Sequence, residues 1–337
     1  HEADVFFSKS KTSSCSSRLG KIEKKEESST NEIGIRAIIN KKQSIVSTTN
    51  LEKQNVYNLT EKVVEMAKVV PENQYCGLAE SDKIKQVSKQ EVQKLEICDT
   101  YEPTMSLIEK EVIKLEESAL DNKEITNSEG AEIAYSKNSI CLLGSNGLEI
   151  EMEKTHSDFI IAVLAGSKDS MEREYDYKSK VFYNELGDFE KIGKEVSQNA
   201  IKKLNSRKLK TCKSDVIFDS KVSSSLLRNL FSASNAQSIV KGISFLKDKI
   251  DNKVFNDRIS IIDDPLMPKK LRSKISDCEG IQSKKKFLIE KGYLKFFFNS
   301  LASAKQIKHE PSGHATRSAS SIPSVSYSNL YLSLIHI

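Results

Sequence analysis

The stretch EIGIRAIINKKQSIVST, residues 32–48, decides the expected fold of the first part of this 337-residue chain. Apolar residues occupy every second position of its first half, the period-2 pattern of a half-buried strand: Ile33, Ile35, Ala37 and Ile39. Residues 40–42 are a plausible turn, and residues 44–48 then form a second strand. The stretch therefore predicts two neighbouring strands with one buried face.

A helical pattern follows these strands. Apolar side chains recur at spacings of three and four, which places them on one face of a helix: Val56, Leu59, Val63, Ala67 and Val70. Pro71 ends the helix. A helix that covers strands forms a two-layer α+β unit, and we assign this strand-helix unit to an N-terminal domain of residues 1–78.

The next part of the chain predicts a β-rich middle domain, residues 104–209, after a polar linker at 79–103. A helix opens it, with one apolar face made of Ile108, Val112, Leu115 and Ala119. Residues 140–143 and 148–152 predict a hairpin, since an Asn-Gly turn with positive φ at both positions joins them. Residues 159–164 predict a further strand, and residues 188–204 a helix.

Residues 210–331 predict a C-terminal α+β domain. Asp215 to Phe218 is expected to be a short buried strand, and residues 286–289 and 293–297 to form a hairpin. Residues 276–280 are expected to form a turn, and the Ser-rich residues 312–328 an extended loop.

Both ends of the chain look artificial. The sequence begins at His1 rather than at methionine, and its last residues, LSLIHI (332–337), match the forward translation of a transposon-end sequencing adapter. We therefore expect a protein truncated at both ends, whose C-terminal domain is incomplete and whose natural sequence ends near Tyr331. His336 then has no function.

The composition of the chain argues against several classes of binding partner. The 52 basic and 47 acidic residues are interleaved, whereas nucleic-acid-binding proteins concentrate basic charge on one face. No apolar run approaches the roughly 18–20 residues that cross a bilayer. The six cysteines include no Cys-x-x-Cys pair, as expected for reduced thiols in a cytoplasmic protein. We therefore expect neither nucleic acid nor membrane as a partner.

One sequence motif could hold a metal. His309, Glu310 and His314 form the pattern His-Glu-x-x-x-His, in which imidazoles bind zinc and a glutamate takes a proton from the bound water. Pro311 and Gly313 oppose this interpretation, because they disfavour the helix on which such ligands are presented. His156 has no second ligand nearby in the sequence.

The order and spacing of many short segments resemble the TldD/PmbA family of metalloproteases, and within it the PmbA (TldE)-like subunits. The segments are residues 16–23 (SSRLGKIE), 34–36 (GIR), 125–130 (ITNSEG), 171–177 (MEREYDY), 206–209 (SRKL), 277–281 (DCEGI), 288–294 (LIEKGYL) and 312–317 (SGHATR). The resemblance implies a cytoplasmic bacterial heterodimer that acts in proteolysis or peptide maturation. One subunit of this pair carries zinc, and the other completes a chamber for unfolded peptides or peptide precursors.

The resemblance also implies which subunit this chain matches. The family's zinc motif follows a strand of the third segment, and the matching residues here, 223–233 (SSSLLRNLFSA), contain neither His nor Glu. We therefore expect a non-catalytic chain without catalytic, cofactor or metal residues of its own, paired with a zinc-bearing TldD-like homologue. Family position places five residues in loops that either line the peptide chamber or serve as plain turns: Asp277, Glu279, Gly280, Gly313 and Arg317.

Two alternatives stay open. The chain is an active zinc metallopeptidase if His309, Glu310 and His314 bind metal with a third ligand from elsewhere. It is a non-enzymatic scaffold or nucleic-acid-binding protein if its retention on DNA falls steeply with salt.

Overall fold

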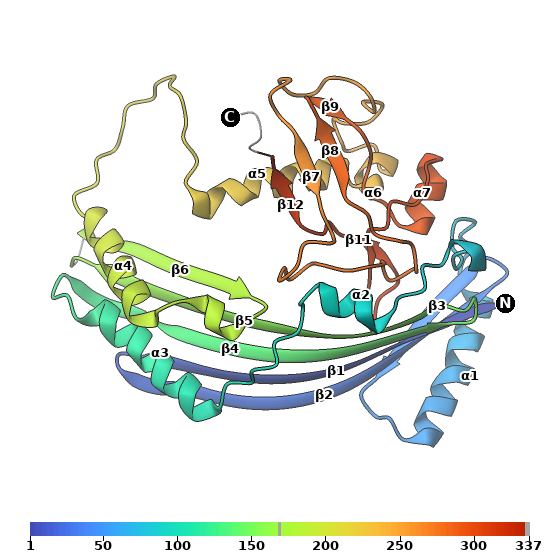
Figure 1. Ribbon diagram of the computed structural model, residues 1–337, viewed down its shortest axis with the longest axis horizontal. Coiled ribbons are helices and arrows are strands. Elements are labelled where there is room, and N and C mark those ends of the chain that lie inside the picture. Colours follow the sequence, from blue (N-terminus) through green and yellow to red (C-terminus); the bar gives the residue numbers. More distant parts are fainter. Residues whose placement is uncertain (168–169, 334–337) are drawn as a thin grey trace.

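One long antiparallel sheet organises the protein, and Figure 1 shows it curving along the base of the molecule. The computed structural model describes residues 1–167 and 170–333. In the order in which they lie side by side, the strands are β3 (Lys42–Thr48), β2 (Lys21–Ile39), β1 (Glu2–Arg18), β4 (Ile125–Gly144), β5 (Glu149–Ala165) and β6 (Glu172–Lys180). The N-terminal and middle segments, which we expected to be separate units, thus share one sheet through the pairing of β1 with β4.

The β1–β2 hairpin is much longer than the sequence predicted. Its register runs from Glu2 opposite Ile38 to Arg18 opposite Lys21. Leu19 and Gly20 both have positive φ, as a two-residue turn of this kind requires. Residues 21–30 of β2 are exposed, so this half of the strand has no apolar alternation from which it could have been recognised.

Three helices cover the convex face of the sheet, and all three were predicted. α1 (Lys53–Val69) packs Val63 and Ala67 against Ile35 and Ala37. α3 (Met105–Leu120) and α4 (Phe189–Lys202) cover the other end of the same face (Figure 1). The apolar face predicted for α3 is fully buried: Ile108, Val112, Leu115 and Ala119. Burial of such side chains contributes about 1.5–3 kcal/mol each before the entropy cost.

The predicted middle hairpin is present, with two corrections. The strand predicted at residues 148–152 begins at Glu149, and it forms one strand, β5, with residues 159–164 rather than two strands. At the turn only Gly147 has positive φ, whereas we expected it of Asn146 as well. Asn146 instead uses its side chain, whose amide donates to the carbonyl of Ala79 at 2.9 Å.

The linker predicted at residues 79–103 contains only short helices, η1 (Ser81–Lys83) and α2 (Lys89–Lys94). A further short helix, η3 (Tyr183–Leu186), precedes α4. All six cysteines are free thiols, as expected. Among the described residues, no helix is both long and apolar enough to cross a bilayer.

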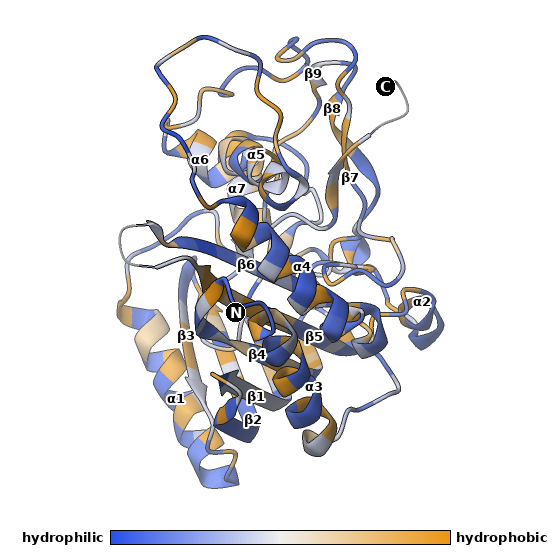
Figure 2. Ribbon diagram, turned by 90° about the vertical axis from the view of Figure 1, so that its left-hand side faces the viewer, coloured by the Kyte–Doolittle hydropathy of each residue, from blue (hydrophilic) through white to orange (hydrophobic). Residues whose placement is uncertain are grey.

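The C-terminal domain lies against the concave face of the sheet (Figures 1 and 2). Its helices are α5 (Ser220–Ser234), α6 (Ala236–Val240) and α7 (Leu301–Ile307). Its four-stranded sheet has the order β12 (Leu330–Leu332), β7 (Ile261–Asp263), β8 (Lys286–Glu290) and β9 (Tyr293–Leu294), while β10 (Ala315–Thr316) pairs with β11 (Ser324–Val325). The predicted β8–β9 hairpin is present, although its second strand ends at Leu294 rather than at residue 297, and its turn residues Lys291 and Gly292 both have positive φ.

Two further segments of this domain, residues 215–218 and 332–333, differ from what the sequence led us to expect. Asp215 to Phe218 is not a buried strand, because it is irregular and Ile217 is 97% exposed. Of the segment we set apart at 332–337, Leu332 pairs with Ile261 and the amide of Ser333 donates to the carbonyl of Ser260 at 2.8 Å. Residues 334–337, which include His336, lie outside the described residues.

The fully buried carboxylate of Glu116 on α3 ties this helix to the far end of the sheet. It accepts hydrogen bonds from the amides of Leu19 (2.9 Å) and Gly20 (3.2 Å) and from the hydroxyl of Ser128 (2.5 Å). We predict that Glu116→Ala lowers the free energy of unfolding by about 3 kcal/mol, because the buried hydroxyl of Ser128 and the two turn amides then lose their acceptor.

Denaturant unfolding measures this loss, and Glu117→Ala is the matched control. Glu117 is the exposed neighbour on the same helix, so its substitution changes stability by no more than about 0.5 kcal/mol. Equal losses in the two variants would contradict the role given to Glu116.

Candidate functional site between the sheet and the C-terminal domain

A buried ionic cluster joins the sheet to the C-terminal domain at a contact that we call the seam. Asp4 of β1 accepts hydrogen bonds from the guanidinium of Arg36 on β2, with Nε at 2.9 Å from Oδ2. Its other oxygen, Oδ1, is paired with Arg317, which follows β10 in the C-terminal domain. The three side chains are at most 3% exposed. One carboxylate thus neutralises one of two buried guanidinium charges.

A tight turn from the C-terminal domain completes the seam. Asp277 accepts three backbone hydrogen bonds, from Glu279 (2.9 Å), Ile281 (3.0 Å) and Ala315 (3.0 Å). Glu279 accepts one from the amide of Leu301 at 2.7 Å, at the start of α7. Burial raises the pKa of Asp277 despite these bonds. Burial, followed by the nearby charge of Asp277, raises the pKa of Glu279 to about 8.

All five residues predicted from family position lie in this seam: Asp277, Glu279, Gly280, Gly313 and Arg317. Gly280 and Gly313 have positive φ, and a Cβ would lie 2.8 Å from a methyl carbon of Leu148 at the first and 2.6 Å from the carbonyl oxygen of Gln282 at the second. Gly280 therefore permits close packing of the turn against Leu148, and Gly313 permits close packing within the C-terminal domain. The burial of all five supports a structural role in the seam, and their role in lining a peptide chamber stays a prediction.

Residues of the seam that the sequence did not single out as site residues are Asp4 and Arg36. Their signal was present, because Arg36 is the charged residue within the apolar stretch from Ile33 to Ile39, and a buried charge requires a partner. The sequence did not identify the partner of Arg36, because Asp4 is distant from it along the chain, and so is Arg317, which shares Asp4.

The helix α5 occupies the region that the family resemblance matches to a zinc motif. Its sequence, SKVSSSLLRNLFSAS, contains no Cys, His, Asp or Glu, the side chains that bind zinc in proteins. Lys221 near its start bonds Glu174 (3.1 Å) and the carbonyl of Tyr175 (3.2 Å) on β6, so the helix is tied to the edge of the long sheet. The donor set of α5 does not fit zinc.

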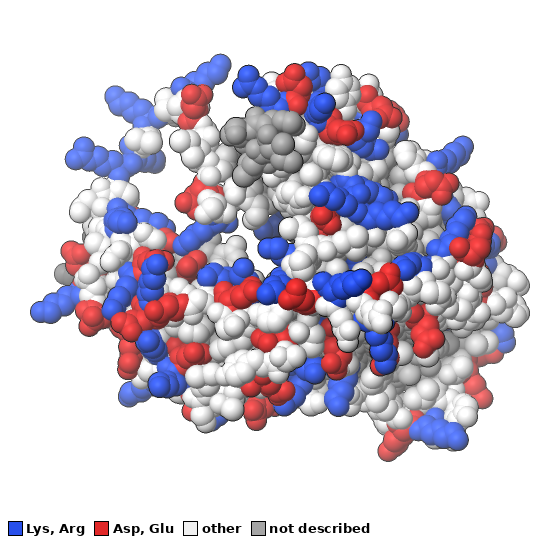
Figure 3. Space-filling view, viewed as in Figure 1, with Lys and Arg blue, Asp and Glu red and all other residues white. Residues whose placement is uncertain are grey.

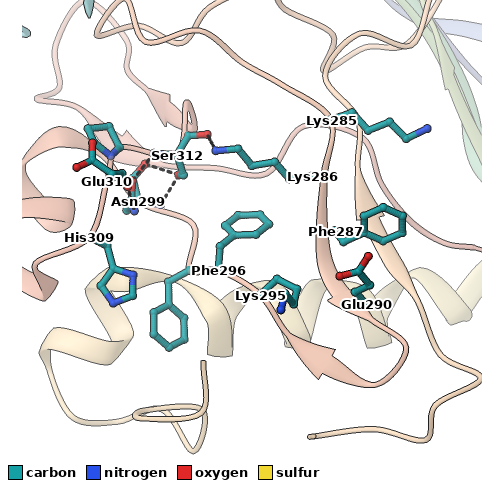
Figure 4. Close-up of a pocket in the computed structure, with 12 residues that line it drawn as sticks. Lys285, Lys286, Phe287, Glu290, Lys295, Phe296, Asn299, His309, Glu310 and Ser312 are labelled. Atoms are coloured by element: carbon teal, nitrogen blue, oxygen red, sulfur yellow. Dashed lines mark hydrogen bonds between the residues drawn. The ribbon is translucent and has the colours of Figure 1, made fainter. Parts of the chain in front are cut away.

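The motif at His309, Glu310 and His314 does not converge either. Both ring nitrogens of His314 are bonded, Nε2 to Asp263 at 3.0 Å and Nδ1 to Ser312 at 2.9 Å. Burial lowers the pKa of His314, although Asp263 opposes this shift. His309 is exposed beside a surface pocket of about 460 Å³, where its imidazole and the Glu310 carboxylate point apart (Figure 4).

The packing around these histidines separates them further. His314 stacks on Phe296 and meets Phe298 edge-on, whereas His309 lies against Phe297. The two imidazoles therefore contact different aromatic side chains. Within residues 1–167 and 170–333, no three His, Cys, Asp or Glu side chains are grouped as a metal site would require.

Ser312, His314 and Asp263 have the order of groups used by hydrolases with a nucleophilic serine. The Ser312 hydroxyl, however, also accepts from the amide of Asn299 at 2.9 Å and lies 3.1 Å from its carbonyl (Figure 4). Ser312 is only 3% exposed. Since its hydroxyl is fully bonded and enclosed, no face is open to a substrate carbonyl, and the three groups act as a structural hydrogen-bond network.

An open hollow lies between the C-terminal domain and the end of the sheet that carries β6 and α4 (Figure 3). The chain that connects α4 to α5 bridges this space, and Lys and Arg side chains gather along it (Figures 1 and 3). On β6 the rings of Tyr175 and Tyr177 stack with centroids 6.2 Å apart, and both are exposed. The register places them on the same face of the sheet as Ile160, opposite the face that α3 and α4 cover.

The raised pKa of Glu279 predicts a specific pH dependence of stability. A carboxyl whose pKa rises from 4.5 to about 8 on folding favours the folded state at low pH, and this contribution is lost as the pH rises between these values. We predict that the free energy of unfolding falls over this range in the wild type, and that Glu279→Gln reduces this fall by an amount on the order of a few kcal/mol.

Denaturant unfolding between about pH 5 and about pH 8 tests the prediction. Glu290→Gln, at an exposed position at the end of β8, is the matched control and keeps the wild-type dependence. An unchanged pH dependence in Glu279→Gln would show that Glu279 is already ionised in the folded protein.

Comparison with known proteins identifies the family of this chain. Three family models match successive parts of the chain: PmbA/TldA metallopeptidase domain 1 over residues 3–67, the central domain over 83–204 and the C-terminal domain over 211–334. A metalloprotease PmbA homolog from Haemophilus influenzae is 25% identical over 315 residues, which cover 93% of this chain and 69% of the relative. One from Buchnera aphidicola subsp. Baizongia pistaciae is 26% identical over 279 residues, which cover 81% of this chain and 61% of the relative. The chain thus spans between three fifths and seven tenths of the length of these two relatives.

Solved structures agree on the fold. TldE from Thermococcus kodakarensis superposes with a TM-score of 0.81 at 20% identity, over 98% of this chain and 74% of its own. A Bacteroides thetaiotaomicron protein assigned as a modulator of DNA gyrase superposes with a TM-score of 0.89, also at 20% identity, over 99% of this chain and 73% of its own. With its three domains matched in order and its fold shared with these structures, the chain belongs to the PmbA/TldD metalloprotease family.

Proposed function

We propose that this chain is the non-catalytic partner subunit of a PmbA/TldD-type metalloprotease. The observation that carries the proposal is the composition of α5, which lies where the resemblance expects the zinc motif and has no side chain that binds zinc. In this proposal the zinc and the hydrolytic chemistry belong to a TldD-like homologue. This chain contributes binding surface for an unfolded peptide or peptide precursor, and it has no catalytic, cofactor or metal residues of its own.

An exposed apolar segment supports association with another protein. The segment consists of residues 216–226, which lead into α5 and include its first half. Five of its large apolar side chains are substantially exposed: Val216, Ile217, Phe218, Val222 and Leu226. Large apolar side chains gathered on a surface mark sites of protein association. In Figure 1, α5 and the chain that leads into it lie between β6 and the strands of the C-terminal domain. We assign this segment to the contact with the zinc-bearing homologue.

The edge strand β6 supports the binding of an extended peptide. A peptide that adds as a strand is held through its backbone, so it binds with little regard to sequence. The carbonyls of Arg173 and Tyr175 on β6 already accept from Lys203 (3.1 Å) and Lys221 (3.2 Å). A peptide would therefore pair with the part of the edge beyond these lysines, beside Tyr177.

The resemblance also favours a cytoplasmic location, and the six free thiols are consistent with a reducing compartment. We infer that the pair acts there in proteolysis of unfolded chains or in maturation of peptides.

We predict that this chain, purified alone, holds far less than one zinc per chain and does not cleave an unfolded polypeptide such as reduced casein. Mixed with a zinc-bearing homologue of the same genome, it restores or raises cleavage, because the chamber is then complete. Mass spectrometry measures the zinc, and gel analysis of casein measures the cleavage.

Variants of both chains provide the controls. Substitution of the zinc ligands in the homologue abolishes cleavage by the mixture, whereas His309→Ala in this chain leaves it unchanged. Stoichiometric zinc in this chain alone, lost in His309→Ala or His314→Ala, would overturn the proposal and make the chain a protease in its own right.

A second prediction concerns the association surface. Val222→Asp combined with Leu226→Asp weakens binding to the homologue by about tenfold or more, since charged groups replace half-exposed apolar side chains in the contact. Val69→Asp is the matched control, because Val69 is an exposed apolar residue at the end of α1, on the convex face. Analytical ultracentrifugation measures the dissociation constants, and equal effects of the two changes would exclude α5 from the contact.

A further inference from the structure

A strongly basic segment lies in the connection from α4 to α5, which crosses the hollow. Between Glu195 and Asp215 the sequence has six basic residues and no acidic one, although the two signs are nearly balanced over the whole chain. Figure 1 shows the connection rise from α4 and descend to α5, and Figure 3 shows Lys and Arg side chains along it. We call residues 202–213 the basic bridge. Its charged members are all exposed: Lys202, Lys203, Arg207, Lys208, Lys210 and Lys213.

Both ends of the connection are held on the edge strand β6. Near its start, the hydroxyl of Ser206 donates to the carboxylate of Glu172 at 2.7 Å. At its other end, Lys221 donates to the carbonyl of Tyr175 at 3.2 Å. The connection thus leaves β6 and returns to it. Its charges therefore border the strand to which we assign an extended peptide.

The carboxylates of β6 neutralise only part of this basic charge. Glu174 is paired with Lys203 and lies 3.1 Å from Lys221. The basic residues that follow Ser206 differ from these two lysines. They are exposed, and among the residues that the structure describes they have no ion-pair partner: Arg207, Lys208, Lys210 and Lys213. Their charge is available to a ligand, and a block of like charges of this kind is typical of a segment that binds an oppositely charged partner.

We propose that the basic bridge binds acidic segments of unfolded polypeptides. Arg207 and Lys213 are six positions apart, so at most about 20 Å of extended chain separates them. Side chains on one face of an extended peptide recur about every 7 Å, so several carboxylates of one short peptide can lie along this length. The inference rests on the proposed function, because it takes the peptide to lie beside β6. Pairing with the edge of β6 does not depend on side chains, and the bridge adds a preference for Asp and Glu.

The surroundings of the bridge favour a polypeptide over a nucleic acid. Proteins that bind single-stranded nucleic acids combine basic charge with aromatic side chains on which bases stack. Residues 202–217 contain no aromatic residue. The nearest aromatic pair on the edge strand, Tyr175 and Tyr177, is stacked ring on ring. The edge of a β-sheet, in contrast, offers backbone groups that pair with a polypeptide backbone.

Fluorescence anisotropy with matched probes tests the proposal on the unaltered chain. One labelled, unstructured peptide carries Glu at alternate positions, and in a second peptide Gln replaces each Glu. The Glu peptide is expected to bind saturably and about tenfold or more tightly than the Gln peptide at low ionic strength. Added salt weakens its binding, because the charges of the bridge are exposed and therefore screened. Equal binding of the two peptides, or binding of neither, would overturn the proposal. An oligothymidylate of the same charge that binds as tightly as the Glu peptide would also overturn it.

Variants of equal charge locate the binding within the molecule. Substitution of the four unpaired bridge residues by Gln reduces the affinity for the Glu peptide about tenfold and leaves that for the Gln peptide unchanged. The bridge variant carries Arg207→Gln, Lys208→Gln, Lys210→Gln and Lys213→Gln. The matched control removes the same charge from exposed positions on or next to α1 and α3: Lys53→Gln, Lys62→Gln, Lys110→Gln and Lys123→Gln. Circular dichroism checks that both variants fold. Equal affinities of the two variants for the Glu peptide would refute the assignment to the bridge.

The outcome is independent of the tests of the partner role. If this chain lacks zinc and restores cleavage but binds the Glu and Gln peptides equally, the role of the bridge is refuted and the partner role stands. If it holds stoichiometric zinc through His309 or His314 and still prefers the Glu peptide, the partner role is refuted and the bridge retains its function in binding.

Discussion

The carboxylate of Asp4 is the contact on which the arrangement of the two halves of this protein depends. It is shared between Arg36 from the neighbouring strand and Arg317 from the C-terminal domain, with all three side chains enclosed. Removal of one member of such a group leaves a buried charge without compensation, which costs far more than the pairing gains. The domain therefore has one favoured position on the sheet, because any other would separate these charges.

This constraint also explains why the seam tolerates unusual electrostatics. The carboxyls of Glu279 and Asp277 have raised pKa values. The backbone around them packs closely at Gly280 and Gly313. A contact optimised for stability alone would use apolar side chains here. Ionisable groups with shifted pKa values are, in turn, common at functional sites.

Sequence patterns predicted the parts of the fold whose burial follows a helical or strand period. The helices α1, α3 and α4 were found in this way, since each buries one apolar face. The outer half of β2 was missed because its residues are exposed on both faces and rich in Glu, Lys and Ser. Asp215 to Phe218 was mistaken for a strand because its apolar side chains, exposed in this chain, follow the same pattern as a buried strand. The candidate site was partly predictable: the turn and loops of the C-terminal domain stood out in the sequence, but their ionic partner Asp4 did not, since only folding brings it near.

The surface of α5 differs in composition from the buried ionic seam. α5 retains a helix at the position expected for a zinc motif, held by Leu230 and Ser234 in the core and by Lys221 on β6, while its exposed positions carry serines and apolar residues. Such a surface can contact another protein or an extended chain, but it cannot activate water. In the function that we propose, this subunit supports catalysis by another subunit through binding, since fixing the position of a substrate lowers the entropy cost of the reaction.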